Sequence, residues 1–157
     1  MKHLELFAGI GGFRRAMDLL TKDNIMKFHC VGYSEIDSKA ETTYRSNYSI
    51  DEDEIVMGDI VAFTNSKKNI KSLPDFDLLT GGFPCQTFSM MGKQAGFDED
   101  RGQMFFRIMD ILTIKKPKYV LLENVKNLRN HDKGRTFDRI KSELESIGYY
   151  VYADIFN

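Results

Sequence analysis

The chain alternates between short apolar runs that end in turn residues and segments whose apolar residues recur at helical spacing, and this alternation limits the fold more than any other feature. It is typical of a parallel β-sheet flanked by helices, so the predicted fold class is α/β. The runs predicted to be strands are residues 3–7, 28–34, 54–57, 75–80, 118–123 and 149–156.

Four segments between these runs have the apolar spacing of amphipathic helices. They extend from Phe13 to Leu20, Ala40 to Tyr48, Met104 to Leu112 and Phe137 to Ile147. Pro117 is expected to end the third helix, and Gly148 can end the fourth in a left-handed conformation. Residues 64–72, rich in Asn, Lys and Ser, are expected to form a polar linker.

Length and composition indicate one domain over residues 1–157, with 42% apolar and 12% aromatic residues. The two cysteines, Cys30 and Cys85, form no pair or histidine cluster, which argues against disulfides and a metal site and favours a cytoplasmic compartment. No apolar run reaches membrane-spanning length, so no membrane partner is expected. A net charge of -1 excludes a uniformly basic nucleic-acid coat but not a local basic face.

Glycines, acids and a thiol collect where the predicted strands end. In chain order these ends carry FAGIGG, Glu35-Ile36-Asp37, Gly58-Asp59-Ile60, GGFPCQ and Glu123-Asn124. Loops that leave the carboxyl edge of a parallel sheet converge on one crevice. Five successive ends of this kind predict a functional site at that edge.

The first three ends predict a pocket for an adenosine-containing ligand. Glycines at positions 9, 11 and 12 let a ligand lie against the backbone, although they could also serve a tight turn alone. Glu35 stands where a ribose presents two hydroxyls, although it could instead be a solvated surface acid, and Asp59 with Ile60 could hold the amino group and ring face of adenine. No Walker-type lysine follows the glycines, so a triphosphate is not expected.

The last two ends predict catalytic groups. Cys85 follows Pro84 in a loop, where a partly exposed thiol suits a nucleophile, although a lone loop cysteine can also be inert. Cys30, inside an apolar strand, is expected to be a small buried hydrophobe. Glu123 ends the run VLLE and is expected to be partly desolvated and able to give or share a proton; otherwise it is a solvated acid or a structural partner of Asn124.

Residues 89–103 have the composition of a hinged loop that could close over a phosphate-bearing partner. Three glycines, at 92, 96 and 102, supply hinges, and Ser89, Lys93 and Arg101 supply groups that bind phosphate. The alternative is a disordered surface loop, and the two descriptions are compatible.

These motifs together resemble those of the cytosine-5 DNA methyltransferases, particularly the enzymes of bacterial restriction-modification systems. The similarity is carried, in chain order, by FAGIGG, Glu35-Ile36-Asp37, Gly58-Asp59-Ile60, GGFPCQTFS, KQAGFDEDRG and ENVKNL. It runs through nearly the whole chain, and the ordered combination is far more specific than any one motif.

The resemblance implies a Rossmann-like fold of S-adenosylmethionine-dependent methyltransferases, with S-adenosylmethionine as cofactor and double-stranded DNA as partner. It implies that Cys85 adds to C6 of a flipped-out cytosine and that Glu123 stabilises the adduct through N3. The implied cofactor-binding residues are Phe7, Gly9, Ile10, Gly11, Gly12, Glu35, Ile36, Asp59, Ile60 and Pro84.

Family members continue beyond the sixth strand into elements that this sequence does not contain: a Gln-x-Arg-x-Arg segment, a seventh strand, a target-recognition domain and a final helix. The chain is therefore expected to be the N-terminal part of a catalytic domain and incomplete alone. It could be part of a longer enzyme, one subunit of a split methyltransferase with a complementing half, or a non-catalytic S-adenosylmethionine-binding remnant. An RNA methyltransferase ranks lower because the sequence around its nucleophile usually differs, and a nicotinamide-dependent oxidoreductase would need the dinucleotide glycine spacing.

Overall fold

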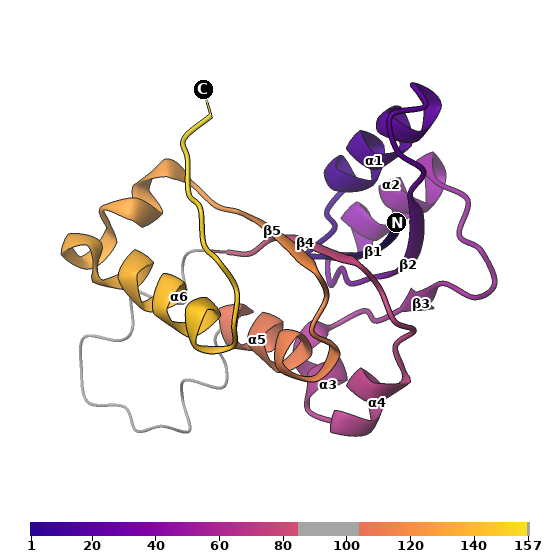
Figure 1. Cartoon of the computed structure of the whole chain (residues 1–157). Coiled ribbons are helices and arrows are strands. Elements are labelled where there is room, and N and C mark those ends of the chain that lie inside the picture. Colours follow the sequence, from indigo (N-terminus) through magenta and orange to yellow (C-terminus); the bar gives the residue numbers. More distant parts are fainter. Residues whose placement is uncertain (85–103, 157) are drawn as a thin grey trace.

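The structure is a computed structural model that describes residues 1–84 and 104–156. In these residues one sheet has the strand order β3-β2-β1-β4-β5, and every pair of neighbouring strands is parallel (Figure 1). The strands are β1 (Lys2–Leu6), β2 (His29–Tyr33), β3 (Ile55–Val56), β4 (Leu78–Gly82) and β5 (Tyr119–Glu123). The predicted parallel α/β sheet is confirmed.

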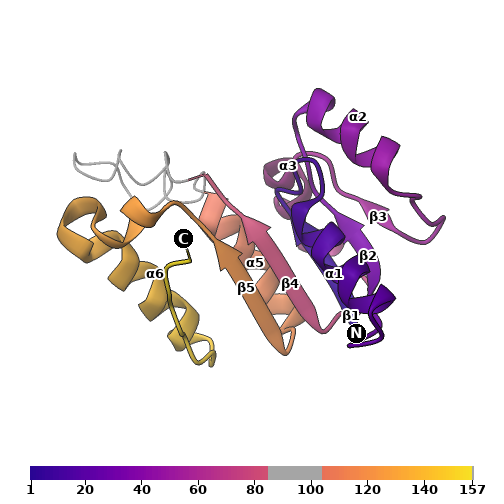
Figure 2. The same ribbon diagram turned by 90° about the horizontal axis from the view of Figure 1, so that it is seen from above.

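Helices cover both faces of the sheet. They are α1 (Gly12–Lys22), α2 (Ser38–Asn47), α3 (Ile60–Thr64), α4 (Lys67–Ser72), α5 (Met104–Lys115) and α6 (Arg135–Ser146), with short 3-10 turns η3 (Lys126–Arg129) and η4 (His131–Gly134). Figures 1 and 2 show α1 and α2 on one face and α3, α4 and α5 on the other. This division follows from right-handed crossovers, since the chain moves one way across the sheet from β1 to β3 and the other way from β3 to β5.

The main hydrophobic core lies between the sheet and the helices α3, α4, α5 and α6. In β1, Leu4 and Leu6 point into this core, whereas His3 and Glu5 alternate with them and face α1 and α2. A smaller cluster on the α1 and α2 face contains Ala8, Tyr33 and Tyr44. In the described ranges, no helix is both long enough and apolar enough to span a membrane.

Local sequence signals explain where several helices begin and end. The Asp37 carboxylate accepts from the amides of residues 39 and 40 and caps α2, and the Asp59 carboxylate accepts from the amide of residue 61 and caps α3. Gly148 follows α6 with φ of 99°, which confirms the predicted left-handed end.

Two sequence predictions about secondary structure are wrong. Residues 149–156 form no strand, because a strand needs a hydrogen-bonded neighbour and no described residue pairs with the outer edge of β5. Residues 64–72 are not a polar linker but contain the end of α3 and all of α4. Ile60 anchors α3 in the core, and Ile70 does the same for α4, whose exposed residues are polar.

Candidate active site

The carboxyl ends of all five strands lie at one edge of the sheet, because every strand pair is parallel. The chain direction across the sheet reverses between β1 and β4, so these neighbours flank the topological switch point where open α/β sheets bind ligands. Phe7 follows β1 at this point, and its ring lies against Gly81 of β4, 3.6 Å from where a Cβ at Gly81 would be.

The turn over residues 7–12, here called the glycine turn, is held by the end of β2. The Phe7 amide donates to the Ser34 hydroxyl at 3.2 Å and the Ala8 amide donates to the Ser34 carbonyl at 2.9 Å. Phe7 itself has φ of 53°, a left-handed conformation that is strained for a non-glycine residue and is found often at functional sites. Ile10 and Gly12 are exposed on the turn.

Glu35 is joined directly to the glycine turn. Its Oε2 accepts from the Gly9 amide at 2.7 Å, and its Oε1 accepts from the amides of Ile36 and Asp37 at 2.9 and 2.8 Å. Glu35 is therefore a half-buried, bonded carboxylate and not a solvated surface acid, whereas the Ile36 side chain beside it is 74% exposed. Since each carboxylate oxygen has two lone pairs, Oε2 keeps capacity for a further donor.

Asp59 and Ile60 are positioned by the start of α3. The half-buried Asp59 side chain uses Oδ1 to accept from the Val61 amide at 2.8 Å. Ile60 is only 4% exposed and packs in the main core, which leaves little of its surface for an adenine ring. The ligand contacts predicted for these two residues stay predictions.

Glu123 lies beside the end of the strand that leads to Cys85. Gly82 is the register partner of Glu123, and a Cβ on Gly82 would be 3.1 Å from the Glu123 Oε2. The Asn124 amide group donates to the Phe83 carbonyl at 2.7 Å and so joins the ends of β4 and β5. The expectation that Glu123 is partly desolvated is wrong, because it is exposed at the end of β5 with its side chain on the face that the main core does not use.

Four predicted site residues, Cys85, Ser89, Lys93 and Arg101, lie outside the described residues. Pro84, directly before them, is exposed. The other cysteine is confirmed as a structural residue, since Cys30 is buried in β2 and its burial raises the pKa of the thiol to about 12.

Sequence reasoning missed a buried polar network behind the glycine turn. The Arg14 guanidinium donates to both carboxylate oxygens of Glu54 at 2.7 and 2.8 Å and to the Tyr44 hydroxyl at 3.2 Å. The Tyr44 hydroxyl in turn donates to Glu5 at 3.1 Å. Burial raises the pKa of Glu5 to about 7. A charged or polar residue inside an apolar strand, as Glu5 is in HLELF, was the available signal for this network.

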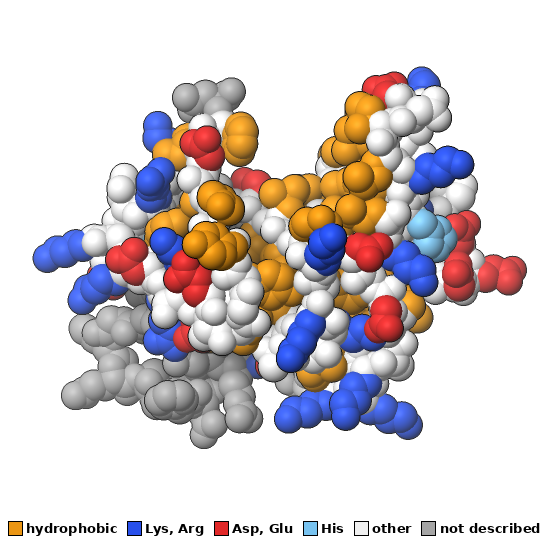
Figure 3. All heavy atoms as spheres, in the orientation of Figure 1, with side chains coloured by type: hydrophobic (Ala, Val, Ile, Leu, Met, Phe, Trp, Pro, Cys, Tyr) orange, Lys and Arg blue, Asp and Glu red, His pale blue; other side chains and the backbone are white. Residues whose placement is uncertain are grey.

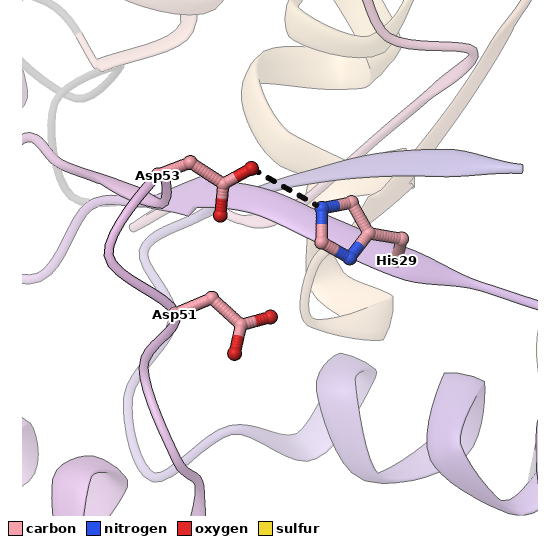
Figure 4. Close-up of side chains that lie close together, drawn as sticks. All are labelled: His29, Asp51 and Asp53. Atoms are coloured by element: carbon pink, nitrogen blue, oxygen red, sulfur yellow. Dashed lines mark ion pairs between the residues drawn. The ribbon is translucent and has the colours of Figure 1, made fainter.

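A group of side chains that could hold a cation lies away from this edge. His29, Asp51 and Asp53 place one ligand atom each within 4.8 Å of one another, and the His29 Nε2 is 4.0 Å from the Asp53 Oδ2 (Figure 4). All three are exposed, and His29 begins β2, so the group lies toward the amino end of that strand, opposite to Glu35. Exposed acidic groups of this kind are common without a metal ion.

Comparisons with known proteins agree with this geometry. A family model described as C-5 cytosine-specific DNA methylase matches residues 1–157. The Type II methyltransferase M1.ScrFI of Lactococcus lactis subsp. cremoris is 48% identical over 155 residues, which are 99% of this chain and 36% of that protein. The Type II methyltransferase M.NlaX of Neisseria lactamica is 44% identical over 154 residues, which are 98% of this chain and 45% of that protein.

A solved structure supports the fold. A crystal structure of a Spodoptera frugiperda DNMT2 variant covers 90% of this chain and 40% of its own length, with a TM-score of 0.61 and 26% identity. The predicted Rossmann-like methyltransferase fold is confirmed, and the chain spans less than half the length of the relatives named. Because the family model matches every residue from 1 to 157, this chain belongs to the C-5 cytosine-specific DNA methylase family.

Proposed function

We propose that this chain supplies the cofactor-binding and nucleophile-bearing part of a DNA cytosine-5 methyltransferase that acts in the cytoplasm. The observation that carries the proposal is the strand order β1-β4-β5 at the carboxyl edge. It places β4, which leads to Cys85, between the glycine turn that follows β1 and Glu123 at the end of β5. The glycine turn and the Glu123 carboxylate therefore lie on either side of the strand whose sequence continues into Cys85.

The residues around the glycine turn fit S-adenosylmethionine, which supplies a methyl group from its sulfonium centre when bound. A Cβ at Gly9 or Gly12 would meet nothing within 4 Å, so the backbone is open there, and the Glu35 Oε2 can accept from a ribose hydroxyl while it also accepts from the Gly9 amide. The remaining contacts of the proposed pocket come from Phe7, Ile10, Ile36, Asp59, Ile60 and Pro84.

The chemistry proposed for the chain's own residues begins with the Cys85 thiolate, which adds to C6 of a cytosine and makes C5 nucleophilic. Glu123, as its protonated carboxyl group, donates to N3 of the ring as the thiolate adds, and at its exposed position it is accessible to a base that enters the crevice. After C5 has taken the methyl group, loss of the C5 proton and expulsion of the thiolate restore the aromatic ring. The base must leave the duplex stack, at a cost of a few kcal/mol. Phosphate contacts from Ser89, Lys93 and Arg101 would offset that cost.

We further propose that activity requires a complementing C-terminal part, in the same polypeptide or in a second one. Val120 and Leu122 of β5 pack toward the main core, so Tyr119 and Leu121 face the other side, where they are 46% and 48% exposed. Figure 3 shows hydrophobic side chains over α1 and across the middle of this side of the molecule. A half-exposed apolar sheet face, beside a strand edge with which no described residue pairs, favours association with further chain.

The test combines binding with covalent trapping. Calorimetric titration with S-adenosylhomocysteine measures the cofactor pocket, and incubation with cofactor and duplex DNA containing 5-fluorocytosine traps the adduct. Both are run with and without the C-terminal remainder of M1.ScrFI as the complementing chain. We expect binding by the chain alone and an adduct in the complemented sample.

The control is Cys85→Ser, which should bind S-adenosylhomocysteine normally and form no adduct. An adduct with Cys85→Ser would contradict the assignment of the nucleophile. Binding by the wild-type chain with no adduct, despite a physical complex with the complementing chain, would favour a non-catalytic S-adenosylmethionine-binding protein.

A further inference from the structure

The glycine turn is held by a tyrosine at the end of α2. The Tyr48 hydroxyl donates to the Gly11 carbonyl at 2.7 Å. The Tyr48 ring lies so close to Gly11 that a Cβ there would be 2.2 Å from the ring carbon Cε2. Gly11 also has φ of 92°, so this position requires glycine both for its backbone conformation and for the ring that covers it.

Tyr48 is itself held in place from α1 and α2. The Arg14 guanidinium carbon lies 5.2 Å from the centre of the Tyr48 ring, and the Tyr44 ring centre lies 5.0 Å from it. Arg14 also donates to the Ser49 carbonyl at 3.0 Å, while its bidentate pair with Glu54 fixes the guanidinium. The hydroxyl of Tyr48 is therefore directed at the turn by a rigid support.

Beside Tyr48, the described residues leave part of the turn open. A cavity of about 390 Å³ opens there, lined by Ile10, Gly11, Gly12, Arg15, Asn47 and Tyr48. Ile10 is 62% exposed, and a Cβ at Gly12 would meet nothing within 4 Å. Two side chains thus hold the turn: the Glu35 carboxylate accepts from the Gly9 amide, and the Tyr48 hydroxyl donates to the Gly11 carbonyl.

We propose that Tyr48 is a positioning residue for S-adenosylmethionine binding: its hydroxyl fixes the Gly11 peptide and so keeps the glycine turn in the conformation that receives the cofactor. The proposal rests on the proposed function of this site. Glycine-rich backbone loses much conformational freedom when it is ordered, and a turn ordered in advance does not lose that freedom on binding. Tyr48 is not proposed to touch the cofactor.

The test compares two variants that each remove one tyrosine hydroxyl. Tyr48→Phe keeps the ring and removes the bond to Gly11. Tyr33→Phe is the matched control, because the Tyr33 hydroxyl donates to Glu41 on α2 and not to the glycine turn, while the ring stays in the cluster with Ala8 and Tyr44. We expect Tyr48→Phe to weaken S-adenosylhomocysteine binding about five-fold, the effect of one ordinary hydrogen bond, and Tyr33→Phe to leave it unchanged.

A second measurement separates positioning from general stability. Amide hydrogen exchange of residues 9–13 in the ligand-free chain should be faster in Tyr48→Phe than in wild type, and saturating S-adenosylhomocysteine should restore the protection. If Tyr48→Phe binds with wild-type affinity, or if Tyr33→Phe loses as much affinity, the role given to Tyr48 is wrong but the proposed function is not affected. Failure of the wild-type chain to bind would instead overturn the proposed function and, with it, the cofactor role of Tyr48.

Discussion

At the scale of single residues, the candidate site depends on glycines as much as on functional side chains, because a glycine leaves space for a neighbouring group. Gly82 lies opposite Glu123 on the neighbouring strand, and the lack of a Cβ leaves space for the Glu123 carboxylate. This close approach connects the strand that leads to Cys85 with the carboxylate proposed to hold the cytosine ring.

Gly82→Ala is expected to slow adduct formation without a large change in stability. The added methyl would be 3.1 Å from the Glu123 Oε2, and the carboxylate, at the end of a flexible side chain, can move away. We expect a change in unfolding free energy below about 1 kcal/mol and a reduced rate of trapping on 5-fluorocytosine DNA in the complemented sample. An unchanged trapping rate would argue against a role for the position of Glu123, and unchanged S-adenosylhomocysteine affinity serves as the control.

Glu5→Gln is expected to change how stability depends on pH. Because burial raises the pKa of Glu5 from 4.5 to about 7, the folded state favours the protonated acid. The stability that protonated Glu5 contributes to the folded state is fully present below about pH 4.5 and is lost as pH rises through about 7. Relative to Glu5→Gln, wild type should lose on the order of 3 kcal/mol of stability across this window.

Urea unfolding of both proteins at several pH values measures this difference. Burial lowers the pKa of His3 to about 4, so the stability that His3 contributes is lost as pH falls. Because both proteins contain His3, this opposite contribution cancels in the comparison. A difference between the two proteins that stays constant with pH would show that Glu5 does not titrate in this way.

At the scale of elements, one arginine joins three segments behind the glycine turn. Arg14 on α1 donates to Glu54 before β3 and to the Ser49 carbonyl after α2. The two side chains of the Arg14 and Glu54 pair are only 11% and 1% exposed, so the ion pair is shielded from water. Its bidentate geometry is specific to a guanidinium.

Arg14→Lys should therefore destabilise the fold although it keeps the charge. The three donors of a lysine side chain lie on a single nitrogen. They cannot reproduce the planar fork with which two guanidinium nitrogens donate to both oxygens of Glu54 and to the Ser49 carbonyl. We expect a loss of about 1–3 kcal/mol in urea unfolding. Arg15→Lys, an exposed change on the same helix, should remain within about 0.5 kcal/mol of wild type. Similar losses in both variants would contradict the role given to the Arg14 pair.

At the scale of the whole molecule, the sheet ends in an uncovered region. No described residue pairs with the outer edge of β5, and the aromatic side chains Tyr150, Tyr152 and Phe156 that follow α6 are each almost fully exposed. Large exposed apolar groups near a free strand edge promote association.

The isolated chain is accordingly expected to self-associate, and Leu121→Lys to reduce that association. The charge would lie on the exposed face of β5, where it opposes apolar contact without entering the core. Sedimentation velocity over a range of concentrations measures the effect. Val125→Lys, another exposed apolar position but beyond the end of β5, is the control. A monomeric wild-type chain would contradict this prediction.

Both the parallel sheet and the meeting of Glu35 with the glycine turn could be predicted from the sequence. Apolar runs and turn residues are local signals, and all five observed strands overlap predicted ones. The glycine turn and Glu35 were found because loops at the carboxyl edge of a parallel sheet must converge. The helix α3 was missed because its five residues are too few to show helical spacing, and α4 because Ile70 is the one apolar residue in its polar sequence.

By itself, then, the sequence determined the five strands of the described sheet, the α/β class and the edge of the sheet that carries the candidate site, since these depend on residues close together in the chain. Only the tertiary structure decided which partners hold that edge: Arg14 with Glu54, Tyr48 with Gly11 and Gly82 with Glu123 are pairs far apart in sequence. It also decided that residues 149–156 do not form a strand in this structure. A strand or a buried ion pair exists only when its partner is present, and local pattern carries no information about that partner.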